Sequence, residues 1–188
     1  MPSTILDKKI RPAVSVTEPV TPTEAKTHCI IDHTDDDALI TVLITRARAQ
    51  VENKTRLSLV EKTVVLTVDL KGCFKLPYGP VRSITTIERR QRLTDDDPDW
   101  DTLTNDEYRT EGEDFKTIVN PLCGVYRISY TVGYTNSAGL FPIEEGLKQA
   151  VLEQVAFMYE NRGDNNKAGK FSDQAAQSLA GHIDYAHV

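Results

Sequence analysis

Two stretches of the chain place apolar residues at the three- and four-residue spacing of an amphipathic helix. They extend from about residue 35 to 56 and from about residue 142 to 162. Each apolar stripe is wide enough to face a core on one side and a neighbouring subunit on the other. The residues that we expect to serve both purposes are Leu39, Leu43, Ile44, Val51, Leu147, Val151, Val155 and Tyr159.

Capping residues support these helices and add a shorter one. Thr21 is the expected N-cap of a short helix that covers residues 22–28, and Thr34 is the expected N-cap of the first long helix. Pro142 suits the first turn of the second long helix, because its missing N–H has no partner there in any case. Gly163 is expected to end that helix.

Between the two long helices, apolar and polar residues alternate, which is the pattern of half-buried β-strands. The clearest strands are expected at residues 63–70, 81–88 and 125–134. Tyr126 and Tyr130 should share one face of the last strand, because side chains of a strand alternate between its faces. This separation of helices from strands along the sequence predicts an α+β fold.

The two ends of the chain lack a strong pattern. Residues 1–20 contain three prolines and are expected to form an extended N-terminal arm, whereas residues 21–162 have the length of a single domain. Residues 163–188 are polar and are expected to form an extended C-terminal tail that docks on a partner or stays flexible. The plausible anchors of this tail are Phe171, Leu179, Ile183 and Tyr185.

Charge is concentrated in one segment. The chain carries 22 basic and 28 acidic residues, a net charge of −6, which argues against a surface that grips nucleic-acid phosphates everywhere. Residues 92–114 hold ten acids and two arginines, so this segment carries −8 and the rest of the chain carries +2. The first half of the segment contains Asp95, Asp96, Asp97, Asp99, Trp100 and Asp101.

The sequence gives no positive support for an enzyme. The four histidines lack the spacing of a helical metal site, and the common nucleotide-binding and nucleophile motifs are missing. We therefore expect no catalytic residue, no cofactor and no bound metal. The three cysteines are widely spaced, and we expect them to be reduced and mostly buried.

Five short pieces, taken in order, resemble one known family. Together the series resembles the head–tail connector (adaptor, or head-completion) proteins of tailed double-stranded DNA phages and prophages. The pieces are VTPTEAKTH at 20–28, DDDALI at 35–40, LPYGPVRSIT at 76–85, YTVGY at 130–134, and LKQA followed by YENR within 147–162.

The resemblance implies a small helical core with a β-rich insertion between the two long helices. It implies a non-enzymatic protein of the virion neck, assembled in the host cytoplasm, that forms a ring of usually twelve copies. Such a ring docks on the portal protein, extends the DNA channel and provides a platform for a stopper or tail-terminator protein. DNA would pass through without sequence-specific binding, and no membrane is involved.

Some alternatives stay open at this point. The acidic segment could line the channel and repel DNA, meet a partner, or be a solvated loop. A neck stopper or tail-completion protein is the alternative from the class of interaction modules. A small metal-dependent hydrolase with its site at residues 95–101 is the enzymatic alternative.

Overall fold

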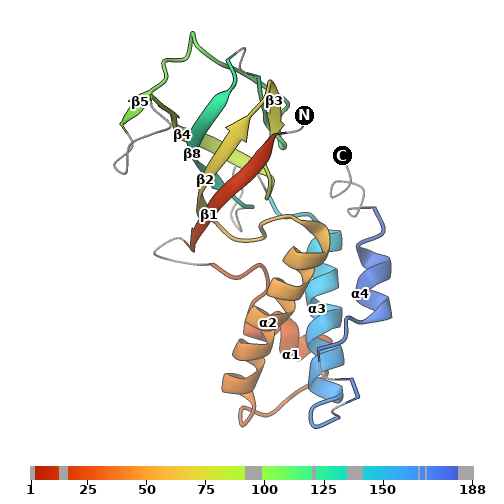
Figure 1. The fold of residues 1–188 in the computed structure, drawn as a ribbon. Helices are drawn as coiled ribbons and strands as arrows, with labels where there is room; N and C mark the ends of the chain where they lie inside the picture. Colours follow the sequence, from red (N-terminus) through yellow and green to blue (C-terminus); the bar gives the residue numbers. More distant parts are fainter. Residues whose placement is uncertain are drawn as a thin grey trace. The chain divides into compact units, whose positions relative to one another are not determined.

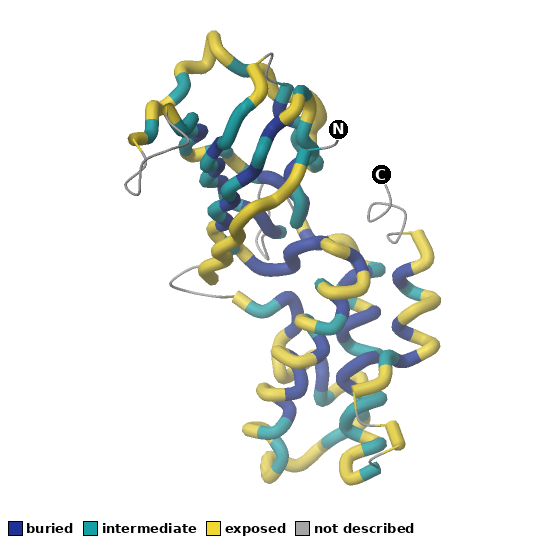
Figure 2. Tube along the Cα trace, viewed as in Figure 1, coloured by how far each residue is buried: buried dark blue, intermediate teal, exposed yellow. Residues whose placement is uncertain are grey.

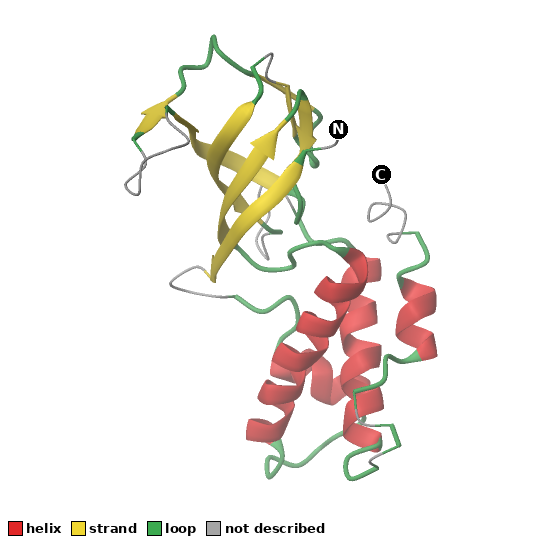
Figure 3. Cartoon of the chain, viewed as in Figure 1, coloured by secondary structure: helices red, strands yellow, loops and turns green. Residues whose placement is uncertain are grey.

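The computed structural model describes residues 3–12, 17–91, 99–119, 122–134, 142–164, 166–167 and 169–181. The chain divides into two compact units, and each unit is made of two separate stretches of sequence. The strand unit comprises Met1–Val16 and Val60–Tyr134, and the helical unit comprises Thr17–Leu59 and Thr135–Val188. Figure 1 and Figure 3 show that the described strands belong to the first unit and the described helices to the second.

The strand unit contains two antiparallel sheets. The larger has the strand order β1-β2-β8-β4-β5, and the smaller has the order β3-β7-β6. The strands are β1 (Thr4–Pro12), β2 (Lys62–Leu70), β3 (Cys73–Lys75), β4 (Val81–Arg90), β5 (Trp100–Thr102), β6 (Arg109–Glu111), β7 (Thr117–Val119) and β8 (Gly124–Val132). The strands predicted from alternating polarity therefore form the centre of the larger sheet.

The strand unit has a hydrophobic core of its own. Every second residue of β2 and β8 is buried, as the alternation predicts. Tyr130 is also buried; its hydroxyl donates a hydrogen bond to the carbonyl oxygen of Pro77 at 2.9 Å, and burial raises the pKa of Tyr130. The core is formed by Val64, Leu66, Val68, Leu70, Leu76, Val81, Ile87, Ile118, Tyr126, Ile128, Tyr130 and Val132.

β1 is the edge strand of the larger sheet, and all nine of its residues are exposed (Figure 2). It pairs with β2 from Thr4 opposite Asp69 to Pro12 opposite Lys62. Residues 4–12 of the expected N-terminal arm are thus extended, and they also belong to a sheet. Charged residues and a proline along such an edge discourage pairing with another chain.

The helical unit is built on two long helices and two short ones. These are α1 (Pro22–His28), α2 (Asp37–Thr55), α3 (Glu145–Glu160) and α4 (Asp173–Ser178). α2 and α3 pack together, α1 contacts both of them, and α4 packs on α3 (Figure 1). The long helices begin and end within three residues of the predicted limits.

The caps agree with the sequence only in part. Thr21 caps α1 as predicted: its hydroxyl accepts a hydrogen bond from the N–H of Glu24, whose carboxylate accepts one from the N–H of Thr21. Thr34 is not the N-cap of α2, because that position belongs to Asp36, whose side chain makes no capping bond. Pro142 precedes α3, whose N-cap is Glu144.

The prediction of an α+β fold with a helical core and a β-rich insertion is wrong. The described residues form a mixed α/β chain with four helices, eight strands and a sheet-rich body. The sheet is not an insertion, since β1 precedes the first helix, and its strands bury a core that needs no helix. The extended C-terminal tail is also wrong for residues 173–178, which form α4. Whether residues 21–162 act as one domain stays a prediction.

Candidate functional site

The apolar stripes of the long helices are mostly used inside the subunit. Of the eight residues expected on these faces, six are buried, and they are Leu43, Ile44, Val51, Leu147, Val151 and Val155. Leu39 and Tyr159 are half-buried. The stripes thus hold α2 and α3 together, and their role in contacts between subunits stays a prediction for Leu39, Tyr159 and the rims of the stripes.

A cavity of about 300 Å³ opens beside the half-buried part of these stripes. Its apolar wall consists of Leu39 and Leu43 from α2 and of Phe157 and Met158 from α3. The charged residues of its lining are Arg46, Arg162, Asp164 and Lys167. The cavity therefore combines an apolar floor with a rim in which positive charge exceeds negative charge.

A polar cluster joins the start of α2 to the end of α3. The Tyr159 hydroxyl donates to Oδ2 of Asp36 at 2.6 Å, and a guanidinium nitrogen of Arg162 donates to the same oxygen at 2.9 Å. The Arg162 guanidinium also lies over the Tyr159 ring, 4.4 Å from its centroid. The Tyr159 hydrogen bond, followed by Arg162, lowers the pKa of Asp36, while the bond to Asp36 raises the pKa of Tyr159.

Gln154 fixes the chain that follows α3. This buried side chain donates from Nε2 to Oε1 of Gln50 at 2.7 Å and to the carbonyl oxygen of Lys170 at 3.1 Å. Its Oε1 accepts a hydrogen bond from the N–H of Ser172 at 2.8 Å. Ser172 in turn caps α4. Gln154 could not be predicted from the sequence, because a lone glutamine on a helix carries no recognisable signal.

The expected tail anchors fall into two groups. Leu179 is fully buried within the helical unit, and Phe171 is half-buried with the Lys54 Nζ 5.7 Å from its ring centroid. Ile183 and Tyr185 lie outside the described residues. Leu179 thus has its partners within the subunit, whereas Phe171 stays partly exposed. The role of these residues as anchors for a partner stays a prediction.

The acidic segment is described from residue 99 onward. Trp100 and Asp101 belong to β5, which pairs with the end of β4, and the Arg127 guanidinium lies 4.1 Å from the Trp100 ring centroid. The indole Nε1 of Trp100 is buried without a hydrogen-bond partner among the described residues. Asp99 and Asp101 are exposed, whereas Asp95, Asp96 and Asp97 lie outside the described residues.

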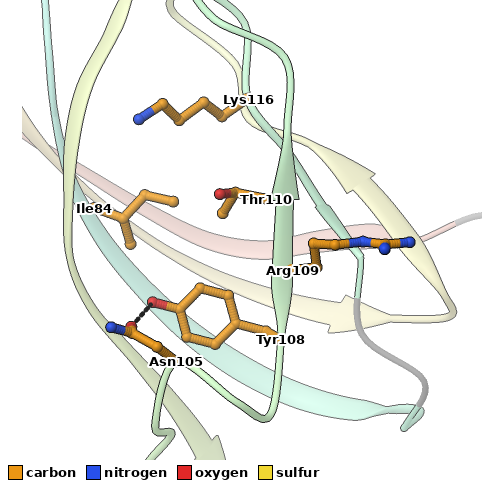
Figure 4. Close-up of a pocket in the computed structure, with 6 residues that line it drawn as sticks. All are labelled: Ile84, Asn105, Tyr108, Arg109, Thr110 and Lys116. Carbon is orange, nitrogen blue, oxygen red and sulfur yellow. Dashed lines mark hydrogen bonds between the residues drawn. The ribbon is translucent and has the colours of Figure 1, made fainter.

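A second cavity, of about 400 Å³, lies in the strand unit beside β4 and β6 (Figure 4). Ile84, Thr110 and Lys116 line it, and the Tyr108 hydroxyl donates to Oδ1 of Asn105 at 3.0 Å at one side. It is open and polar, and its lining contains no carboxylate or histidine.

The described residues also show no arrangement suited to a metal ion or a membrane span. Across residues 3–181, apart from the gaps in the description, no three His, Cys, Asp or Glu side chains are placed to hold a metal ion. In the same residues no helix is long and apolar enough to cross a bilayer. The expectation of mostly buried cysteines is wrong, because Cys73 and Cys123 are exposed and Cys29 is half-buried.

Comparison with known families adds to this geometry. Residues 21–85 match the family model of phage gp6-like head–tail connector proteins. The resemblance stated from the sequence is thereby confirmed, and its first three pieces fall within or at the edge of the matched range. No curated protein gives a significant match to the chain.

Solved structures match the chain over nearly its whole length. A chain of the "virion of native gene transfer agent (GTA) particle" shares 18% identity at a TM-score of 0.70, covering 92% of this chain and 94% of that one. A chain of the "neck of empty GTA particle computed with C6 symmetry" shares 19% identity at a TM-score of 0.68, covering 91% of this chain and 93% of that one. A chain of the "neck of native GTA particle computed with C12 symmetry" shares 20% identity at a TM-score of 0.63, covering 90% of this chain and 94% of that one. These matches establish a shared fold.

Proposed function

We propose that this chain is a structural, non-enzymatic subunit of the neck of a phage-like particle, where copies of it form a ring around the path of the DNA. The observation that carries the proposal is the reciprocal match to neck chains, which covers at least 90% of either chain. Because both parts of the fold are matched, the likeness does not rest on one common supersecondary motif. The connector family region over residues 21–85 points to the same role.

The finer parts of the proposal concern the ring and its neighbours. We propose twelve copies, docked on the portal protein, that extend the DNA channel and carry a stopper or tail-terminator protein. Two of the similar structures are described with sixfold or twelvefold symmetry, which supports a closed ring. A net charge of −6 suits a ring that lets DNA pass without holding its phosphates.

The acidic segment is proposed as a surface of this ring rather than a catalytic site. In a ring, copies of the exposed acids of residues 99–114 would be gathered into one belt. A belt toward the channel would repel DNA, and a belt toward the next neck protein would attract a basic partner. The stacking of Arg127 on Trp100 orders the strand that carries Asp101 at the start of this segment.

The mass of the full chain in solution tests the proposal directly. Analytical ultracentrifugation or native mass spectrometry, with and without portal protein, should show monomers that convert to a closed ring, and the ring should carry about twelve 21.0 kDa chains. A ring requires two different patches on each copy, so intermediate two- and three-chain species should be open rather than closed. A chain that stays monomeric at millimolar concentration and beside portal protein would contradict the proposal.

A further inference from the structure

Ile30 is an exposed hydrophobic residue in a backbone conformation that isoleucine avoids. It is 92% exposed, whereas the other exposed large hydrophobics of the described residues lie between 40% and 57%. Its φ is +56°, in the left-handed region that is unfavourable for a β-branched side chain. The strain and the exposure are both costs to an isolated subunit. A contact outside the subunit would offset them.

The backbone around Ile30 explains why the strained conformation is needed. The N–H of Ile30 donates to the carbonyl oxygen of Thr27, and the N–H of Ile31 donates to that of Lys26 at 2.9 Å. These two bonds end α1 in a Schellman motif, in which the position of Ile30 is usually glycine or asparagine. The motif therefore presents this side chain to solvent at the end of a rigid helix.

The residues that follow Ile30 are acidic. Asp32 and Asp35 are exposed, and neither forms an ion pair within the part of the chain that the structure describes. The neighbouring Asp36 and Asp37 are already paired with Arg162 and Lys26. The exposed isoleucine thus has two unpaired carboxylates close to it in the sequence.

The cavity floored by Leu39, Leu43, Phe157 and Met158 has the complementary character. Its apolar floor lies beneath Arg46, an exposed arginine with no partner in the described residues. A volume of about 300 Å³ can admit a branched aliphatic side chain. The apolar side chain of Ile30 therefore matches the apolar floor of the cavity. The negative charges of Asp32 and Asp35 are opposite in sign to the net positive charge of the cavity rim.

The two features lie on opposite sides of α2. Leu39, Leu43 and Arg46 share one helix face at spacings of four and three residues. Asp37 and Arg48, which pair with Lys26 and Glu18 of the segment around α1, project from the opposite face at 3.6 residues per turn. A chain cannot fill its own cavity from there, but the next copy can.

We infer that Ile30 of one copy inserts into the Leu39–Met158 cavity of the next copy and that this head-to-tail contact closes the ring. The inference rests on the proposed function, for which it names the contact surface and the partner, a second copy of this chain. A contact between two different patches generates a ring when its rotation closes. The pairing of Asp32 and Asp35 with Arg46 would set the direction in which copies meet.

The first test removes the apolar insert without harming the fold. Ile30→Asn is the substitution of choice, because asparagine tolerates the left-handed conformation at the end of a helix. We expect an unchanged or raised unfolding midpoint and an at least tenfold weaker association by analytical ultracentrifugation of the full chain. Leu122→Asn, which alters another exposed hydrophobic residue, should leave association unchanged.

The second test uses the directionality of the contact. Leu39→Glu places a carboxylate in the cavity and leaves Ile30 intact, and Arg46→Glu is the substitute if the first variant unfolds. Each variant alone should stay monomeric. An equimolar mixture of Ile30→Asn and Leu39→Glu chains keeps one intact contact per pair, so it should form a two-chain species and no ring.

The outcomes separate this inference from the proposed function. If the wild-type chain and the Ile30→Asn variant form the same ring, the Ile30 contact is overturned and the proposed ring still stands. A mixture of the two variants that rebuilds the full ring would also overturn it, because a directional contact cannot be rescued in that way. A wild-type chain that never associates, with or without portal protein, would overturn both.

Discussion

At the scale of single residues, the position of Gly133 has room only for glycine. It follows β8 at a φ of +117°, and a Cβ built there would lie 2.2 Å from the carbonyl oxygen of Val60. We expect Gly133→Ala to lower the free energy of unfolding by about 2–4 kcal/mol, because strain and overlap with backbone add together. Urea unfolding measures this loss.

Gly72 supplies the matched control for this substitution. Its φ is +100°, but no atom lies within 4 Å of the position that a Cβ would take. Gly72→Ala should therefore cost only the conformational strain of about 1 kcal/mol. Equal losses at the two positions would show that the approach of Val60 does not matter.

The Asp36 cluster predicts a pH dependence of stability. The folded chain lowers the pKa of Asp36, mainly through the Tyr159 hydrogen bond. The stabilisation that ionised Asp36 adds to the folded state is therefore fully present above the unfolded pKa of about 3.9. This stabilisation is lost as the pH falls through the pKa of Asp36 in the folded chain. Since the pKa of Tyr159 is raised, its own contribution is lost when the pH rises above about 10.

Tyr159→Phe tests this linkage. The variant should have a higher Asp36 pKa by carboxyl ¹³C NMR, although Arg162 still keeps it below that of a free aspartate. Tyr108→Phe removes a different tyrosine hydrogen bond, to Asn105, and should leave the Asp36 titration unchanged. An Asp36 pKa that does not respond to Tyr159→Phe would contradict the hydrogen-bond explanation.

At the scale of elements, α4 depends on one buried side chain of α3. Gln154→Ala would leave the N–H of Ser172 and the carbonyl oxygen of Lys170 without their partner. A buried polar group left unpaired costs about 1–3 kcal/mol, so α4 should separate from α3 more readily. Hydrogen–deuterium exchange should rise across residues 172–179 while the cores of α2 and α3 stay protected.

Gln149→Ala provides the control on the same helix. Gln149 is exposed, and its side chain donates to Oε1 of Glu153 one turn further along α3. The other carboxylate oxygen of Glu153 accepts a hydrogen bond from the Ser178 hydroxyl of α4, and that bond remains in the variant. This substitution should leave exchange in α4 unchanged. Similar exchange in both variants would mean that Ala175 and Leu179, rather than Gln154, hold α4 in place.

The sequence predicted the elements best where burial leaves a periodic pattern. β2 and β8 were predictable because each has one buried and one partly exposed face. β1 was not, because an edge strand that is exposed on all its residues shows no alternation. α4 is only six residues long and buries Ala175 within it, which is too little to stand out from a polar stretch.

At the scale of the whole molecule, the prediction of a helical core failed for a topological reason. The alternation of apolar and polar residues between the two long helices suggested that the strands form an insertion. A sequence pattern does not reveal that β1 pairs with β2, from which α1 and α2 separate it along the chain. The candidate site was predicted only in part. The stripe residues were named correctly as apolar, but six of the eight were buried by α2, α3 and their neighbours. Ile30 was missed, because its exposure depends on how α1 ends.

The interleaving of the two units has a consequence for the order in which the chain can fold during synthesis. β1 is made first, but its partner β2 follows only after α1 and α2, and the centre of the sheet waits for β8 at Gly124–Val132. α2 likewise waits for α3, which ends at Glu160. The strand unit can be completed only after α1 and α2 have been made, and the helical unit only after the strand unit. The nascent chain therefore carries unpaired strand and helix surfaces until most of it has been translated, so chaperones that cover such surfaces should raise its yield.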